Sequence, residues 1–219
     1  MSLLLANCTR PVDGRPIYVT ETPSNDLPLV KIDQLPPLML TPAEAGTVIN
    51  DPNLAGTLTY TEANHVPDGF LSDLKCAGVM APGAELTYRG SGYQSVYGEM
   101  LVDQDQPRVG EVAIAYGGGE EAQAFVDTAT SQWKYCAGRT LTVNVQEPPV
   151  NWIASAPHRS DGVDVLLRRM EGGQGFACAR AMAARSNIVV DVLVCGTDDA
   201  DLEHQGATIV NMALSRIRK

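Results

Sequence analysis

Residues 176–196 decide the fold, and they read FACARAMAARSNIVVDVLVCG. The residues at 176–184 and 188–195 form two predicted strands, and the second is strongly β-branched. Ser186 and Asn187 stand between them at the position of a two-residue turn, where Asn tolerates a positive φ. This stretch therefore predicts a β-hairpin.

The register of this hairpin places two cysteines opposite each other. A turn at the centre of the stretch pairs Arg185 with Ile188, and counting outward then pairs Cys178 with Cys195. In that register the cysteines form a non-hydrogen-bonded pair, whose short Cα separation suits a disulfide. The hairpin therefore predicts a disulfide and a compartment in which thiols are oxidised.

Five cysteines are present in the chain: Cys8, Cys76, Cys136, Cys178 and Cys195. The last four allow three connectivities, and if the hairpin pairs Cys178 with Cys195, then Cys76–Cys136 follows by elimination. The alternative is four free buried thiols in a cytosolic protein. No metal site is predicted, because the chain contains no C-x-x-C motif and its histidines lie far from the cysteines in sequence.

The start of the chain has the pattern of a lipoprotein signal. Residues 3–7 read LLLAN and precede Cys8, as at the end of an apolar signal region that runs into a lipoprotein cleavage site. Residues 1–8 are therefore predicted to be a signal-peptide remnant with Cys8 as the lipidated residue. Asn7 departs from the small residue that such sites prefer. A stray cysteine in a disordered start is the alternative.

A tether and a folded body are predicted to follow. Residues 9–37 contain six prolines among polar residues, a composition that predicts an extended tether, and the domain is predicted to span 38–219. The sequence TPAE at 41–44 is a capping box with proline at the first helical position. It predicts a short helix that ends at Asn50.

The remaining pattern predicts an α+β fold. Apolar residues at helical spacing predict a helix over 120–133, and Thr197 is predicted to cap a last helix with Asp198 and Asp199 in its first turn. The expected architecture is a largely antiparallel twisted sheet with about three helices packed on one of its faces, held by two disulfides. Further strands are predicted at 57–60, 86–88, 93–102, 109–116, 140–145, 151–154 and 163–169.

Composition excludes some classes of function. The 219 residues are 44% hydrophobic, which suffices for a full core, and they carry a net charge of −10. The 16 lysines and arginines are scattered, so a nucleic-acid partner is not expected. No run of 18 apolar residues predicts a membrane-spanning helix.

No catalytic constellation or cofactor site is predicted. Three glycines at 117–119 stand between a predicted strand and a helix, but the strand after that helix lacks the carboxylate that a dinucleotide ribose requires. His158 lies in a predicted loop without a partner, and no nucleophile–base pair can be assembled. We therefore predict a domain that is not an enzyme.

Five residues are candidates for ligand binding: Tyr88, Tyr93, Tyr97, Arg180 and Asp191. Tyr93 and Tyr97 share strand parity, and edge packing is the principal interpretation of the two rings, with the lining of a ligand-binding groove as the second. Arg180 and Asp191 lie diagonally across the hairpin on its cysteine face. A structural ion pair is the principal interpretation of that pair, and ligand recognition is the second.

Five further segments of the chain can be compared with known families: DLKCAG (73–78), YRGSGY (88–93), WKYCAGRT (133–140), GFACARA (175–181) and NIVVDVLVCG (187–196). Taken together, they resemble the PknH-like extracellular sensor domain, a family found on actinobacterial receptor-type serine/threonine kinases and in free-standing lipoproteins. The resemblance covers about residues 35–219. It implies one α+β domain with the disulfides Cys76–Cys136 and Cys178–Cys195, a cleft for an unidentified extracytoplasmic ligand, and no catalytic residue.

The leading hypothesis is therefore an envelope lipoprotein that acts as a sensor or binding domain. It would be anchored by Cys8 at the outer face of the plasma membrane, or secreted, and would bind a small molecule or an envelope component. One alternative is a protein-interaction or scaffolding domain without a small ligand. Another is an envelope hydrolase. The sequence indicates no oligomeric state.

Overall fold

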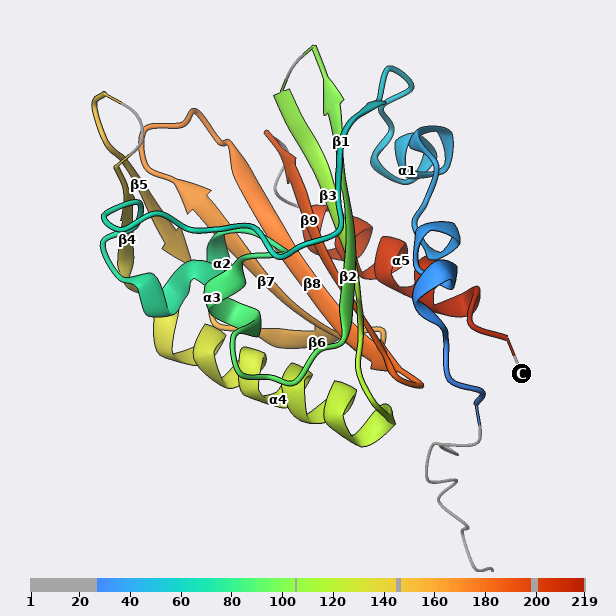
Figure 1. Cartoon of the computed structure of the whole chain (residues 1–219). Coiled ribbons are helices and arrows are strands. Elements are labelled where there is room, and N and C mark those ends of the chain that lie inside the picture. The colour runs from blue at the N-terminus through green and yellow to red at the C-terminus, as the bar shows by residue number, and fades with distance from the viewer. Residues whose placement is uncertain (1–26, 105, 145–146, 198–200, 219) are drawn as a thin grey trace, which may run out of the picture.

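The computed structural model describes residues 27–104, 106–144, 147–197 and 201–218. Within these ranges nine strands form one antiparallel sheet, in the order β1-β2-β3-β9-β8-β7-β5-β4, and β6 pairs with β7 (Figure 1). The strands are β1 (Ala55–Tyr60), β2 (Ser95–Asp103), β3 (Gln106–Ala115), β4 (Thr140–Val143), β5 (Val150–Ala154), β6 (His158–Ser160), β7 (Val163–Met170), β8 (Ala177–Arg185) and β9 (Ile188–Gly196).

Five α-helices and three 3-10 turns accompany the sheet in the described part of the chain. The capping box predicted at Thr41 is present, and Asn50 ends the first helix in the left-handed conformation. The helices are α1 (Pro42–Ile49), α2 (Ala77–Met80), α3 (Glu85–Tyr88), α4 (Gly119–Cys136) and α5 (Leu202–Ser215), and the 3-10 turns are η1 (Ile32–Gln34), η2 (Pro36–Leu38) and η3 (Leu74–Cys76).

The β8–β9 hairpin lies at the centre of the sheet in the predicted register. Arg185 pairs with Ile188, and Cys178 pairs with Cys195 at a Cα–Cα distance of 4.1 Å. Ser186 rather than Asn187 takes the left-handed conformation in the turn, with φ 52°. Both predicted disulfides, Cys178–Cys195 and Cys76–Cys136, are confirmed.

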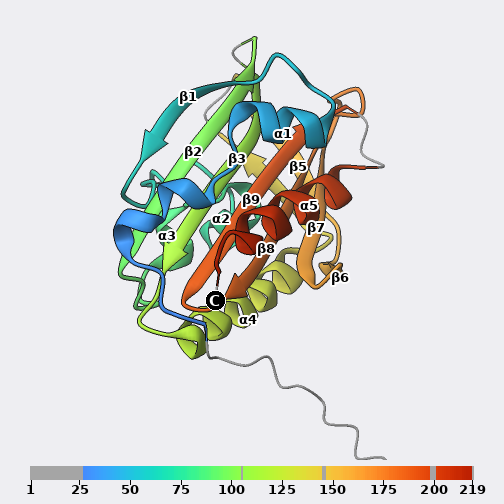
Figure 2. The ribbon, with the colours of Figure 1, turned by 90° about the vertical axis from the view of Figure 1, so that its right-hand side faces the viewer.

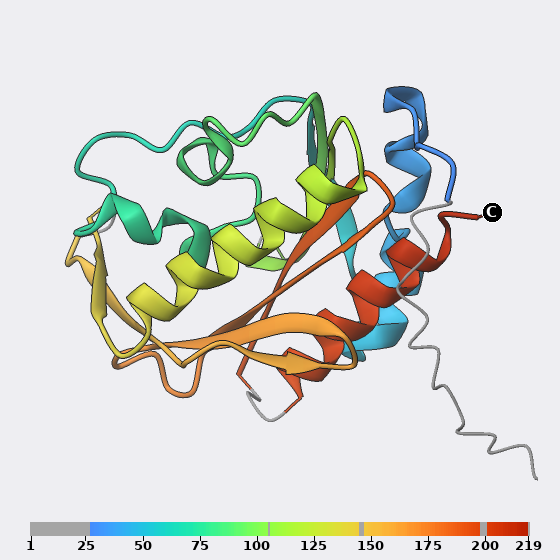
Figure 3. The same ribbon diagram turned by 90° about the horizontal axis from the view of Figure 1, so that it is seen from below.

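Helices cover both faces of the sheet, which corrects the prediction of a single covered face. Val190, Val192 and Val194 pack on the side of α5, whereas Val189 and Leu193 pack on the side of α4. Figure 3 shows α4 and α5 on opposite sides of the central strands. The physical reason is visible in β9, because a strand that is apolar at nearly every position must be buried on both faces.

Two predicted elements differ in the structure. The segment predicted as a strand at 86–88 is the short helix α3, which follows a left-handed Gly83 with φ 75°. Three residues are too few for periodicity to distinguish a strand from a helical turn. The predicted cap at Thr197 is wrong, because α5 begins at Leu202 after Asp201, where the buried apolar stripe starts. Asp198 and Asp199 lie outside the described residues.

The tether prediction is wrong for residues 28–37, which pack against the body beside α5. Asn187 accepts a hydrogen bond from Val30 N (2.8 Å) through Oδ1 and donates to Val30 O (3.1 Å) through Nδ2. Leu35 and the following apolar residues are buried in the core on the α5 side. Figure 2 looks onto this face, where α1 and α5 lie over the central strands. The proline content therefore led to the tether prediction, although apolar residues of the same segment anchor it to the core. Residues 9–26 lie outside the described part.

None of the described helices combines the length and the apolar character that crossing a bilayer requires.

A buried carboxyl group also holds the N-terminal segment. Glu111 of β3 is 1% exposed, and its Oε2 accepts a hydrogen bond from Leu40 N at 3.0 Å. Its Oε1 has no hydrogen-bond partner among the described residues. Burial, which outweighs the Leu40 hydrogen bond, raises the pKa of Glu111 to about 7.

We expect Glu111 to make folding stability depend on pH. The folded pKa of about 7 lies above the unfolded value of 4.5, so this contribution is fully present below pH 4.5 and is lost as the pH rises through 7. The expected loss is about 3 kcal/mol. Urea unfolding at pH 5 and pH 8 should show that Glu111→Gln removes most of this difference. Glu120→Gln, at an exposed position of α4, should leave the pH dependence of stability unchanged. Equal pH dependence of wild type and Glu111→Gln would contradict the prediction.

Candidate functional site

Three of the predicted ligand-binding residues form one internal network. Tyr88, Arg180 and Asp191 are all 0% exposed. The guanidinium of Arg180 forms an ion pair with the carboxylate of Asp191, and the Tyr88 hydroxyl donates a hydrogen bond to the same carboxylate. Burial, followed by the Asp191 charge, raises the pKa of Tyr88 well above its usual value.

This network joins the central hairpin to the short helices. Arg180 donates to the carbonyl of Gly78, which also accepts from Trp133 Nε1 at 3.2 Å, and Gly83 N donates to the Tyr88 hydroxyl at 2.9 Å. The structural interpretation of the Arg180–Asp191 pair is therefore confirmed. The structure does not support the ligand-recognition alternative, because both side chains are fully buried and paired with each other.

The interpretation that Tyr93 and Tyr97 line one groove is wrong, because the two rings pack on opposite sides of the sheet. Tyr93 precedes β2, which begins at Ser95, so strand parity does not extend to it. Tyr97 packs on the α5 side of the sheet, whereas Tyr93 packs on the α4 side with its ring 6.1 Å from that of Tyr88. The two rings therefore cannot line one surface.

A cleft of about 440 Å³ lies on the α4 side of the sheet, and we name it the Arg168 cleft. Its floor crosses strands from β2 to β4, and residues of the segment that leads into and out of α2 form part of its wall. Its lining residues are Phe70, Met80, Ala81, Met100, Gln106, Val143, Val150, Trp152, Arg168, Met170, Phe176, Cys178, Leu193 and Cys195.

Arg168 of β7 is the charged residue of this lining, and it is 5% exposed. Its Nη2 donates to Met80 O at 2.8 Å, and Nη1 contacts Met80 Sδ at 3.5 Å. The guanidinium also lies 4.1 Å from the centroid of the Trp152 ring. Its Nε has no hydrogen-bond partner within the described ranges. Arg168 is therefore held in place with part of its donor capacity unused.

The charge of Arg168 is poorly compensated. No described carboxylate lies within ion-pair distance of it, and the neighbouring Arg180 carries the same charge. Burial, with a smaller effect of Arg180, lowers the pKa of Arg168 to about 9. Arg180 is matched by Asp191, so Arg168 is a buried positive charge at this cleft without a counterion among the described residues.

The other walls of the cleft are apolar and aromatic. Trp152 and Phe176 meet edge to face with ring centroids 6.0 Å apart, and the Cys178–Cys195 disulfide lies against the same cavity. Sequence reasoning missed Arg168, although a signal was present. Two arginines at 168 and 169 follow one another in a predicted strand, and alternation must turn one of them toward each face.

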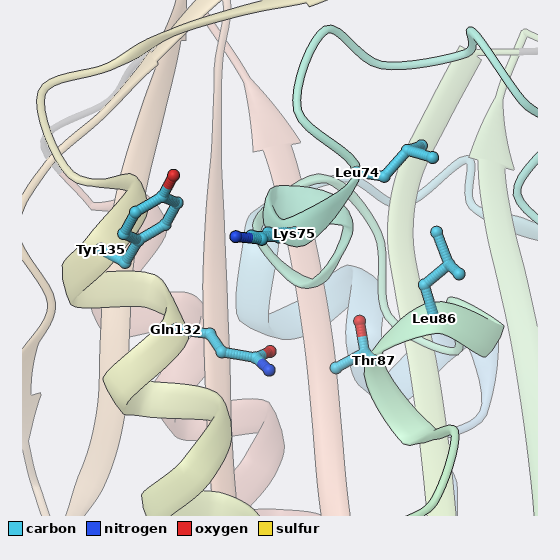
Figure 4. Close-up of a pocket in the computed structure, with 6 residues that line it drawn as sticks. All are labelled: Leu74, Lys75, Leu86, Thr87, Gln132 and Tyr135. Carbon is cyan, nitrogen blue, oxygen red and sulfur yellow. The ribbon is translucent and has the colours of Figure 1, made fainter.

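A second cavity of about 480 Å³ lies between α4 and the η3 and α3 segments. Figure 4 shows Lys75, Thr87 and Gln132 pointing into this space. Its rim includes Tyr135, which is 43% exposed and carries Arg139 over its ring at 4.1 Å. Its described lining contains no buried charged side chain, whereas the lining of the Arg168 cleft contains the buried Arg168. We therefore take the Arg168 cleft as the candidate functional site.

The described residues bring together no group of three or more His, Cys, Asp or Glu that could hold a metal ion.

Comparison with known proteins places these features in a wider context. The profile of the PknH-like extracellular domain matches residues 30–216. The chain is 26% identical over 190 residues to the serine/threonine-protein kinase PknH of Mycobacterium bovis, covering 85% of this chain and 31% of the kinase. It is 25% identical over 159 residues to the serine/threonine-protein kinase PknJ of Mycobacterium tuberculosis, covering 69% of this chain and 27% of the kinase. The chain thus spans less than a third of the length of each of these two kinases.

A solved structure shares the fold. The crystal structure of the extracellular domain of PknH from Mycobacterium tuberculosis superposes with a TM-score of 0.79 at 26% sequence identity. The superposition covers 87% of this chain and 97% of that domain. The matched part is the extracellular domain and not the kinase catalytic domain.

Proposed function

Because this chain belongs to the PknH-like extracellular domain family, we propose that it is a sensor or binding domain that takes a small molecule or envelope component into the Arg168 cleft. The family match covers residues 30–216 and so includes every residue that lines the cleft. The single observation that carries the proposal is a 440 Å³ cavity with apolar walls and one buried, incompletely bonded cation. This combination is typical of small-molecule sites.

Rigid elements support the cleft. Its floor is a paired sheet held by the β8–β9 hairpin, and its α2 wall is tied to α4 by the Cys76–Cys136 disulfide. A preformed site of this kind loses little conformational entropy when a ligand binds. The cleft is therefore suited to recognition without a large rearrangement.

The proposal includes attachment to a membrane. The chain is an extracellular domain, and lipidation of Cys8 would hold it at the outer face of the plasma membrane. Cys8 lies outside the described residues, so its sequence context alone supports this part. Residues 9–26 would then connect the lipid to the segment that packs beside α5.

A protein-interaction or scaffolding domain without a small ligand is the second candidate function. The two functions differ in how they depend on the Arg168 cleft. A scaffolding domain does not need an open cavity, so a variant with a filled cleft would still bind its protein partner.

Native mass spectrometry of the folded chain after incubation with a mycobacterial envelope extract tests the proposal. Ala81 is exposed at the cleft, so Ala81→Trp should fill the cavity without removing a core side chain. We expect wild type to retain a bound small molecule and Ala81→Trp to lose most of it. Ala43→Trp is the matched control, because Ala43 is exposed and α1 packs on the opposite side of the sheet from the cleft.

The outcomes separate the two functions. Retention by wild type and Ala43→Trp, with loss in Ala81→Trp, supports the cleft. Repeated recovery of bare wild-type protein, or equal retention by Ala81→Trp, would refute binding in the cleft and favour the scaffolding function.

A further inference from the structure

We infer that the Arg168 cleft selects an anionic amphiphile, a molecule in which one terminal carboxylate or phosphate is joined to an apolar chain. This inference rests on the proposed function and adds the chemical class of the ligand. The anion would pair with Arg168, and the chain would lie along the aromatic and methionine side chains of the walls.

The first argument is the charge at the cleft. Arg168 is 5% exposed and unpaired by any described carboxylate, whereas the neighbouring Arg180 is paired with Asp191. A buried guanidinium without a counterion is unfavourable, and an anion from solution would compensate it. Among the described residues the lining includes no acidic side chain that would oppose an anion or favour a cation.

The second argument is the geometry of the guanidinium. Its Cζ lies 4.1 Å from the centroid of the Trp152 ring, its Nη2 donates to the Met80 carbonyl at 2.8 Å, and its buried Nε has no partner in the described structure. A planar donor group with spare N–H groups matches a carboxylate or phosphate, which accept two hydrogen bonds side by side. Arg168 is therefore prepared for an anion before the anion arrives.

The third argument is the composition of the walls. Phe70, Trp152 and Phe176 provide aromatic surface, and three methionines provide flexible, polarisable surface. Methionine adapts to irregular apolar shapes, which suits a chain with many conformers. The methionines are Met80, Met100 and Met170.

Isothermal titration calorimetry of the full chain with four compounds that share a ten-carbon chain, all below micelle-forming concentration, tests the inference. The compounds are decanoate, decyl phosphate, decanol and decyltrimethylammonium. At least one of the two anions should bind about 10- to 100-fold more tightly than decanol, the range for hydrogen bonds to a charged group. The relative affinities of decanoate and decyl phosphate indicate whether a carboxylate or a phosphate head is the better fit.

Two arginine variants locate the effect. Arg168→Met should reduce the affinity for the better anion to that for decanol, while keeping the apolar contacts. Arg169→Met is the matched control, because Arg169 follows in β7 and its side chain is exposed. It should retain the anion preference within about twofold.

Several results would overturn the inference. Equal affinity for decanoate, decyl phosphate and decanol removes anion selection, although binding lost in Ala81→Trp would still support the proposed function. Tightest binding of the ammonium compound reverses the predicted charge. Failure of all four compounds refutes an amphiphile of this class, and capture from the envelope extract then decides the proposed function separately.

Discussion

Asp191→Ala should lower the free energy of unfolding by about 3–5 kcal/mol, because it leaves a buried guanidinium without its counterion. Asp191 pairs with Arg180 and accepts from the Tyr88 hydroxyl in a fully enclosed environment. The variant therefore removes the counterion of Arg180 and the acceptor of the Tyr88 hydroxyl at once. Urea unfolding under non-reducing conditions measures the change.

Two companion variants identify the cause. Tyr88→Phe removes two hydrogen bonds, the one donated to Asp191 and the one accepted from Gly83 N, and should cost about 1–3 kcal/mol. The double variant Arg180→Met/Asp191→Leu removes both charges and should be more stable than Asp191→Ala, since an apolar pair needs no desolvated counterion. A loss below about 1 kcal/mol for Asp191→Ala would show that water reaches the network and that the enclosed geometry is incorrect.

Replacing both cysteines of the Cys76–Cys136 bridge with alanine should destabilise the domain by about 4 kcal/mol. The bridge closes a sequence separation of 60 residues, and the chain-entropy model relates stabilisation to loop length. Cys178–Cys195 spans 17 residues within a paired hairpin, so removing it should cost about 1 kcal/mol less. Thermal and urea unfolding of the two double variants measure this order.

The longer bridge should also matter for binding. Cys76 lies at the start of α2, and Met80 and Ala81 at its end line the Arg168 cleft. Without the bridge, we expect weaker retention of extract ligands at a temperature where the domain is still folded. Wild type at the same temperature serves as the comparison, because Cys178 and Cys195 themselves line the cleft and their replacement would alter it directly. Equal stability loss in both double variants would contradict the dependence on loop length.

Local sequence was sufficient for several features. The position of the turn at Ser186-Asn187 defines the pairing of Cys178 with Cys195, because each step outward from the turn pairs one residue with one residue. Thr41 and Glu44 carry their own capping geometry within one helical turn. These features depend on residues close together in the chain, so they could be predicted.

The candidate site depended on contacts that the sequence does not display. Tyr93 and Tyr97 were placed on one face by parity, but the strand begins only at Ser95. Arg168 was missed because its role arises from an unpaired position opposite Met80, 88 residues earlier in the chain. Whether Arg168 has a counterion depends on residues of several elements that surround it, so it cannot be predicted from the sequence of one strand.

Sequence by itself determined the hairpin register, the two disulfides, the α+β class and the family resemblance, because turn chemistry, cysteine spacing and β-branched runs act locally or within one pairing. Tertiary structure alone decided that both sheet faces are covered, that residues 28–37 pack, and that Arg168 rather than Tyr93 and Tyr97 marks the cleft. Burial and charge compensation are sums over distant neighbours, so they exist only once the chain has folded.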